Sequence, residues 1–337
     1  MEIQYILYLL NSQLPNKILF ISKSITSSST RYRALQFYPY LYQHDFTPTH
    51  SQISGGVFTF LKTLYIANKA DTVVVLRKTF PFILTWLLKL VSNKLIFDLD
   101  DAIFCSTDGS SSITRKKRFK NIVMLSDHVF AGNTFLAENT LLFNKSVTVI
   151  PTCLNVKKYD ITVNKPDDHI DLVWIGSKST SKYLLNILPI LEQAAKEQPK
   201  LRLKIIADFS LTNAKINTLN IPWAEHTEAE ELASSHIGIA PMIENDWTRG
   251  KCALKVLQYM AAKLPVISSN VGVNSEVICI GKTGYLVSTT NEWLNAIEQL
   301  SANLLKQKSM GIAGQKQVKL HYDNRVIFKR ALPILKP

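Results

Sequence analysis

Short runs of β-branched and apolar residues alternate with longer segments of helical periodicity along nearly the whole chain. In the first half, the apolar runs lie at residues 17–21, 72–76, 94–99, 128–131 and 147–150. Helical patterns fill the segments between them, at residues 31–43, 57–68, 80–91, 114–125 and 134–143. Strands that alternate with helices in this way are typical of βαβ units, which build a parallel sheet covered by helices.

The same alternation begins again after residues 153–168, a polar segment without a clear period that reads as a linker. Strands are expected at residues 171–175, 202–207, 236–240, 264–268 and 284–287, and helices at 183–197, 229–234, 253–262, 275–277, 292–303 and 322–335.

A chain of 337 residues is also longer than one hydrophobic core usually organises. We therefore expect an α/β protein with two doubly wound, Rossmann-like domains that face a central cleft, at residues 1–160 and 161–320. Ligands of such sheets bind outside the carboxyl ends of the strands.

The net charge of +13 is unevenly distributed, because residues 1–165 carry 19 Lys and Arg against 10 Asp and Glu. A basic first half indicates an anionic partner, such as lipid head groups, a phosphorylated acceptor or nucleic acid. The densest basic run is Arg115, Lys116, Lys117, Arg118 and Lys120, which a solvated helix face would explain equally well. We expect no nucleic-acid partner, because the sequence contains no recognised reading module.

Several classes of protein are disfavoured by the sequence. The four cysteines and seven histidines show no spacing typical of a metal or redox site, so no metal site is expected. Residues 1–14 lack the basic leader and cleavage site of a signal peptide. The longest apolar stretch, residues 80–91, is interrupted by Lys89 and is too short to cross a bilayer. We expect a cytoplasmic protein, and peripheral attachment to the inner face of the membrane stays open.

The first candidate ligand site is the turn that follows the expected strand at residues 171–175. It contains Gly176, Ser177, Ser179 and Thr180 and leads into a helix. Backbone N–H groups and hydroxyls at such a position suit a diphosphate. An ordinary capped helix start is the alternative.

The second candidate is the start of the helix at residues 253–262. Lys251 and Lys255 are four residues apart and share one helix face, with Arg249 just before them. Two cations there oppose the helix dipole unless an anion compensates, and a nucleotide diphosphate would do so. Gln258 lies one turn further on, within reach of ribose hydroxyls. Two solvated lysines are the alternative interpretation.

Two groups in the first half are candidates for the acceptor side. In the segment Asp98-Leu99-Asp100-Asp101, an Asp-x-Asp pair could hold Mn²⁺ or Mg²⁺. We expect instead that Asp100 and Asp101 end a strand at the cleft, where a carboxylate can orient or deprotonate a hydroxyl. A structural role, such as capping or pairing with arginine, is equally open.

Arg31 and Arg33 follow the serine-rich residues 22–30, and their planar guanidinium groups match phosphate or carboxylate. They are candidates for binding an anionic acceptor or for closing on the donor diphosphate. The alternative is an interdomain ion pair.

Residues 238–277 resemble the nucleotide-binding signature of family 4 glycosyltransferases (glycosyl transferases group 1), which are retaining enzymes of the GT-B fold. Further matching pieces are VIPT at residues 149–152, FDLDDAIF at 97–104 and SSTRYR at 28–33, so the resemblance spans most of residues 17–335. This sequence departs from the family pattern at one pair of positions. The family carries two glutamates eight positions apart where this chain has Gly250 and Gln258.

The resemblance implies a metal-independent, hexosyltransferase-like enzyme without a cofactor. Its first domain would bind a glycan or lipid-linked acceptor, and its second a UDP or GDP sugar, in cell-surface polysaccharide synthesis. Residues 321–337 would form a helix that packs back on the first domain. The residues expected in catalysis are Asp100, Asp101 and Lys255; in donor binding Gly176, Ser177, Ser179, Thr180, Arg249, Lys251, Lys255 and Gln258; in acceptor binding Arg31 and Arg33. A non-catalytic nucleotide-sugar-binding subunit, suggested by Gly250, and a nucleotide-sugar epimerase are the alternatives.

Overall fold

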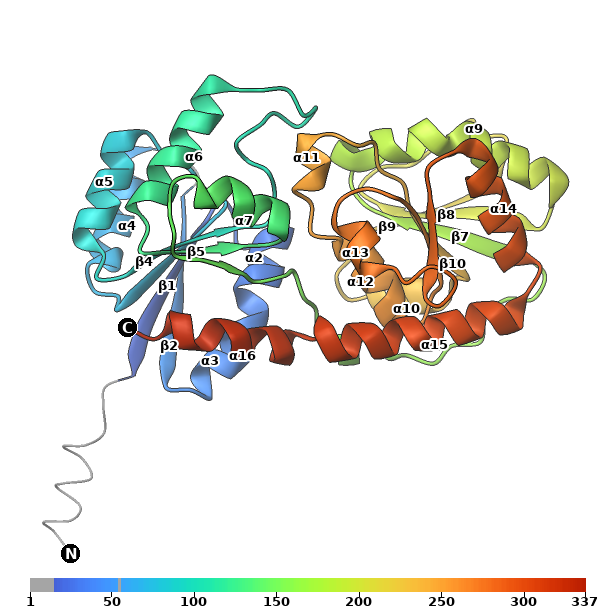
Figure 1. Cartoon of the computed structure of the whole chain (residues 1–337). Helices are drawn as coiled ribbons and strands as arrows, with labels where there is room; N and C mark the ends of the chain where they lie inside the picture. Colours follow the sequence, from blue (N-terminus) through green and yellow to red (C-terminus); the bar gives the residue numbers. More distant parts are fainter. Residues whose placement is uncertain (1–14, 54–55) are drawn as a thin grey trace, which may run out of the picture.

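A computed structural model describes residues 15–53 and 56–337, and these residues fold into two α/β domains set side by side (Figure 1). Residues 1–14, in which we expect no signal peptide, lie outside the described residues. No helix in the described ranges is long and apolar enough to cross a membrane.

The described part of the first domain forms a six-stranded parallel sheet in the order β2-β1-β3-β4-β5-β6. The strands are β1 (Asn16–Ser22), β2 (Phe46–Gln52), β3 (Thr72–Leu76), β4 (Leu95–Leu99), β5 (His128–Ala131) and β6 (Val147–Val149). The sequence predicts all of them except β2. That strand is polar, contains Pro48 and pairs only with β1 at the edge of the sheet, where proline is tolerated.

Helices cover both faces of this sheet, because successive side chains of a strand point to opposite sides. One face carries α4 (Val57–Ala67), α5 (Phe82–Val91), α6 (Ile113–Leu125) and α7 (Thr134–Leu141). The other carries α3 (Tyr38–Tyr42) and the last helix, α16 (Asn324–Leu335). The single helix expected at residues 31–43 is instead α2 (Ser28–Arg33), a 3₁₀ turn (Leu35–Phe37) and α3.

The second domain repeats the plan, and in the described range its sheet has the order β12-β11-β10-β7-β8-β9. Its strands are β7 (Ile170–Ile175), β8 (Leu201–Ala207), β9 (Asn217–Pro222), β10 (Ile237–Ala240), β11 (Val266–Ser269) and β12 (Gly284–Val287). Its helices are α8 (Val156–Tyr159), α9 (Ser181–Glu197), α10 (Glu228–Ala233), α11 (Asp246–Arg249), α12 (Leu254–Ala261), α13 (Val273–Val277) and α14 (Thr290–Ser301), followed by α15 (Leu304–His321). The two doubly wound α/β domains predicted from the sequence are thereby confirmed, and β9, α8, α11 and α15 are additions to the prediction, with α8 lying in the expected linker.

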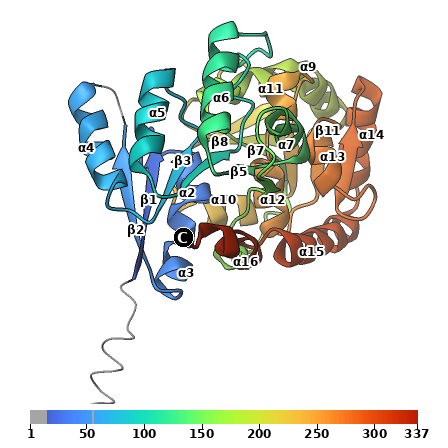
Figure 2. The same cartoon turned by 60° about the vertical axis from the view of Figure 1, so that its left-hand side comes forward.

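The chain crosses between the domains a second time after α15, and α16 then lies against the first domain (Figures 1 and 2). The two crossings are joined by hydrogen bonds. The N–H of Leu154 donates to the carbonyl of Tyr322 at 3.1 Å, and the N–H of Asn324 donates to the carbonyl of Leu154 at 2.9 Å. The buried Ile327 and Phe328 hold α16 in the core of the first domain.

Candidate active site

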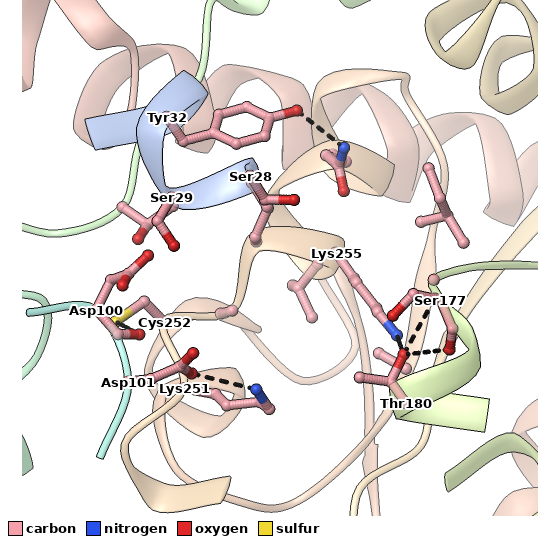
Figure 3. Close-up of a pocket in the computed structure, with 18 of the residues that line it drawn as sticks. Ser28, Ser29, Tyr32, Asp100, Asp101, Ser177, Thr180, Lys251, Cys252 and Lys255 are labelled. Carbon is pink, nitrogen blue, oxygen red and sulfur yellow. Dashed lines mark hydrogen bonds and ion pairs between the residues drawn. The ribbon is translucent and has the colours of Figure 1, made fainter. Parts of the chain in front are cut away.

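A cavity of about 390 Å³ lies between the two domains (Figure 3). Its wall comes from segments that follow the carboxyl ends of β1, β3 and β4 in the first domain and of β7 to β11 in the second. This is the edge of a doubly wound sheet at which ligands bind, so two such edges face each other across one space.

Two lysines line the second domain's side of the cavity. Lys255 lies in the first turn of α12, but Lys251 lies in the loop before this helix, so the expectation that both share one helix face is wrong. The Nζ of Lys255 donates a hydrogen bond to Oγ1 of Thr180 at 3.3 Å and lies 4.1 Å from the ring centre of Trp174. Burial, together with the charge of Lys251, lowers the pKa of Lys255 to about 7. Among the described residues, no carboxylate forms an ion pair with Lys255. An ammonium group held in a cavity without a counter-charge is a site for an anion.

The turn after β7 brings Gly176, Ser177 and Thr180 to the same wall. A side chain at Gly176 would collide with the ring of Trp174, since a Cβ atom built there lies 2.2 Å from it. The backbone N–H groups expected to meet a diphosphate are partly occupied, because Lys178 N–H donates to Asp208 Oδ1 at 2.6 Å. Ser179 is exposed and lies outside the cavity lining, where its hydroxyl meets that of Ser177 at 2.8 Å.

Gln258 is buried in the cavity wall, whereas Arg249 does not line the cavity. The Nε2 of Gln258 donates to the hydroxyls of Tyr32 at 3.2 Å and Tyr159 at 3.3 Å. Arg249 is half exposed, and its guanidinium lies 4.5 Å from the ring centre of Phe135 in the first domain. Its position therefore does not fit the expected contact with a donor.

A buried carboxylate beside Gln258 was not anticipated from the sequence. Glu228, at the start of α10, is 1% exposed and lines the cavity. Its carboxylate accepts hydrogen bonds from Tyr159 at 2.5 Å, Tyr32 at 3.3 Å and the indole N–H of Trp223 at 2.8 Å. Burial and this carboxylate raise the pKa of both tyrosines, so their hydroxyls stay protonated and donate. In the sequence, Glu228 is an ordinary acid in the first turn of an amphipathic helix.

Asp100 and Asp101 line the opposite wall, where β4 ends. An arginine that sequence reasoning missed holds both of them. Arg77 follows β3 directly, lines the cavity, and lies 3.3 Å from Asp100 and 2.5 Å from Asp101. It also donates to the hydroxyl of Ser29 at 2.6 Å. Lys251 completes the group across the domain boundary, with its Nζ 3.2 Å from Asp101.

The backbone of Arg77 is left-handed, with a φ of 56°, a conformation that costs energy for a residue with a side chain. Its N–H donates to the carbonyl of Asp98 on the neighbouring strand at 2.8 Å. This bond and the contacts of its guanidinium hold the residue in place. The two acidic side chains are therefore fixed in orientation by an arginine from the adjacent strand.

The two arginines expected at an acceptor occupy different environments. Arg31 lines the cavity and makes the interdomain ion pair that was its alternative reading, 3.3 Å from Glu225, while its guanidinium lies 4.8 Å from the ring centre of Trp223. Arg33 points into the first domain with a side chain 2% exposed, paired with Asp98 at 2.7 Å. The expected acceptor contact of Arg33 is thus corrected: it is a buried structural ion pair.

Gly250, which stands where the family pattern has its first glutamate, is packed against the first domain. A Cβ atom built there would lie 2.5 Å from the Cβ and 2.6 Å from the backbone nitrogen of Ala102. In this closed arrangement no side chain fits between the two domains at position 250. Position 250 is therefore taken up by a direct contact between the domains.

Comparisons with known proteins agree with this geometry. Residues 170–303 match the family described as glycosyl transferases group 1. Nearly the whole chain, 95–96% of it, superimposes on a sucrose-phosphate synthase from Thermosynechococcus elongatus (13% identity, TM-score 0.72, 98% of that chain) and a glycosyltransferase from Rickettsia africae (18%, 0.73, 98%). It also superimposes on Anabaena HepE in complex with UDP and glucose (14%, TM-score 0.69, 95% of this chain and 99% of that chain). No curated protein sequence matches significantly. The GT-B fold expected from the sequence is confirmed.

Proposed function

We propose that this chain, a group 1 glycosyltransferase of the GT-B fold, transfers a hexose from a nucleotide diphosphate to a glycan or lipid-linked acceptor. We further propose retention of anomeric configuration and a role in cell-surface polysaccharide synthesis, as the resemblance of residues 238–277 implies. Of the two expected nucleotides we favour UDP, since HepE binds UDP and UDP-glucose. The location that we propose is the cytoplasm, at the inner face of the membrane.

The observation that carries this proposal is the pair Lys251 and Lys255 on the second domain's wall. As the bond between sugar and diphosphate breaks, negative charge accumulates on the leaving diphosphate. Lys255, which has Thr180 rather than a carboxylate as its partner, is already held in the cavity to stabilise that charge. Lys251 would join it after leaving Asp101. The same two lysines supply the charge that a divalent ion would otherwise bring, so we propose catalysis without a metal.

The acceptor hydroxyl would enter from the opposite wall, where Asp100 and Asp101 lie. Arg77 fixes the direction of both carboxylates, and a fixed carboxylate can accept a hydrogen bond from the attacking hydroxyl. Lys251 contacts Asp101 in the structure, so binding of a diphosphate would draw this lysine toward the donor. In our proposal Asp101 then becomes available to the acceptor.

Thermal unfolding with a panel of nucleotide sugars tests the proposal, because a ligand that binds only the folded state raises its stability. We expect UDP-hexoses to stabilise the protein and sugar transfer to acceptor lipids or glycans to continue in EDTA. Stabilisation without transfer would instead identify a non-catalytic binding subunit. Conversion of the donor in the absence of any acceptor would identify an epimerase, and stabilisation by no nucleotide sugar would refute the proposal.

Binding of UDP-glucose is expected to take up a proton above neutral pH. Burial and the charge of Lys251 lower the pKa of Lys255 to about 7, so this side chain is largely neutral at pH 8 before a ligand binds. A neighbouring diphosphate favours the charged form and raises this pKa, so the bound state holds the additional proton. Affinity should therefore fall as the pH rises above 7.

Calorimetry of UDP-glucose binding at pH 8, in buffers of different ionisation enthalpy, measures this uptake directly. The diphosphate of UDP-glucose is esterified at both ends, so it contributes no titration of its own in this range. The variant Lys255→Met is the control and should bind without proton uptake. Equal affinity at pH 7 and pH 9, with no uptake in the unsubstituted protein, would contradict the prediction.

A further inference from the structure

Two neighbouring helices of the first domain present apolar side chains to the solvent. On α4 these are Phe58, Leu61 and Tyr65, spaced three and four residues apart, and Phe58 is 89% exposed. On α5 they are Phe82, Ile83, Trp86 and Leu90. Each helix also buries an opposite face, through Phe60 on α4 and Leu88 on α5. Apolar stripes on both faces are unusual for a helix on the surface of a monomeric protein.

The helix beside them, α6, is strongly basic. It packs next to α5 on the same face of the sheet (Figure 2). Its first turns expose Arg115, Lys116, Lys117 and Arg118, and they begin with Ile113, which is 86% exposed. Together α4, α5 and α6 carry seven Lys and Arg and no Asp or Glu. The surface therefore combines exposed apolar side chains with basic side chains, and the three helices carry no acidic ones.

The three helices begin at the edge of the sheet that carries the cavity, although the cavity lining contains none of their residues. Each of the three helices follows a strand whose carboxyl end lies at the cavity edge of the sheet: α4 follows β2, α5 follows β3 and α6 follows β4. The amino-terminal ends of the helices, with Phe58, Phe82 and Arg115, accordingly lie toward the side on which Arg77 and Asp101 line the cavity. An acceptor anchored beside these helices would reach the cavity from the first domain's side.

We propose that α4, α5 and α6 form a docking surface for an anionic lipid leaflet. Phe58, Tyr65 and Trp86 enter the boundary between head groups and acyl chains, where aromatic side chains are favoured. The basic start of α6 binds lipid phosphates. A second copy of this chain fits less well, because two such surfaces would bring like charges together, and of their described Lys and Arg residues only Lys89 has an acidic partner, Asp127. This surface rests on the proposed location at the membrane, for which it supplies the lipid contact, and it is independent of the proposed transfer reaction.

Flotation of the full chain with vesicles tests this surface. We expect binding to vesicles of phosphatidylcholine with phosphatidylglycerol and little binding to phosphatidylcholine alone. The double variant Phe58→Ser/Trp86→Ser should lower partitioning by roughly tenfold or more, because it removes inserted apolar area. The triple variant Arg115→Ser/Lys116→Ser/Lys117→Ser should remove the preference for anionic lipid.

Matched controls come from α15 of the second domain. Leu305→Ser removes a leucine that is 82% exposed, and Lys308→Ser/Lys316→Ser/Lys319→Ser removes three exposed lysines. Both should bind vesicles as the unsubstituted protein does. Thermal stabilisation by UDP-glucose in every variant would show that fold and donor site are intact, whatever the outcome of the transfer assay.

Two results would overturn the proposal. One is vesicle binding that the substitutions in α4, α5 and α6 reduce no more than the controls on α15. The other is a concentration-dependent dimer, seen by light scattering without lipid, that Phe58→Ser/Trp86→Ser abolishes while the unsubstituted chain ignores vesicles. In that case the surface is a contact between copies of the chain.

Discussion

Replacing Lys255 with methionine is expected to remove most of the thermal stabilisation that UDP-glucose gives this protein. The Lys255 ammonium lines the cavity, is hydrogen-bonded only to Thr180 Oγ1, and has no ion-pair partner among the described residues. A hydrogen bond to a charged group contributes about 1.5–3 kcal/mol, which corresponds to a ~10- to 100-fold loss of affinity. Methionine keeps the length of the side chain and its contact with Trp174.

The same substitution should leave the ligand-free protein as stable as before, or slightly more stable. Burial already disfavours the charged form of Lys255, so its removal ends an unfavourable desolvation. Lys178→Met is the matched control, because this exposed lysine lies in the turn after β7 but does not line the cavity. If Lys255→Met responds to UDP-glucose as the unsubstituted protein does, the diphosphate lies elsewhere.

Replacing Arg33 with methionine is expected to destabilise the first domain by about 3–5 kcal/mol, since it leaves one partner of a buried ion pair uncompensated. The side chains of Arg33 and Asp98 are 2% and 4% exposed, and Arg33 also donates to the carbonyl of Ile150 at 2.6 Å. Denaturation by urea, followed by circular dichroism, measures the free energy of unfolding. The melting temperature should fall by roughly 6–20 °C.

The pH dependence of this loss identifies its cause. Burial raises the pKa of Asp98 even with Arg33 in place, and without the arginine the pKa in the folded state rises further. The folded variant then binds a proton that the unfolded chain does not, so the loss of stability should shrink as the pH falls. Lys89→Met breaks the more exposed pair with Asp127 and should cost no more than about 1 kcal/mol. If Arg33→Met lowers the free energy of unfolding by as little as Lys89→Met at every pH, Arg33 and Asp98 do not form a buried ion pair.

The sequence predicts the fold well wherever a strand is buried on both sides. Such strands are continuous apolar runs. For the run TVVVL, the predicted bounds are the same as those of β3 in the structure. The two missed strands, β2 and β9, lie at sheet edges, where half-exposed polar residues hide the pattern. Helix α15 was missed because it contains Gly311 and Gly314, which lower helix propensity. Its packing explains them, since a Cβ at Gly311 would meet the carbonyl oxygen of Lys263 at 2.0 Å.

The sequence places correctly in the fold those candidate residues whose position follows from the ends of strands, while their roles stay predictions. Asp100, Asp101, Lys251 and Lys255 all line one cavity, as the carboxyl-end rule for doubly wound sheets requires. Arg33 is two residues from Arg31, but it points the other way, because residues two apart in a helix lie on different faces.

Two residues of the site could not be found from local sequence. Arg77 depends on the pairing of β3 with β4, which sets it beside the two aspartates, and on a left-handed backbone that no turn signal announces. Glu228 becomes part of the site only when Tyr32, from the other domain, meets it. Both assignments need the tertiary arrangement rather than the pattern of residues along the chain.

The bonded pair of crossings at Leu154 and Tyr322 restricts how the molecule can move. Two chain segments tied to each other act as one pivot, because the domains cannot slide apart without breaking the bonds between Leu154, Tyr322 and Asn324. We expect the cavity to open by rotation of the domains about this point, which would separate Arg31 from Glu225 and Lys251 from Asp101. Substrate entry and product release would both depend on this rotation of the domains. The rate of the rotation would therefore set an upper limit on turnover.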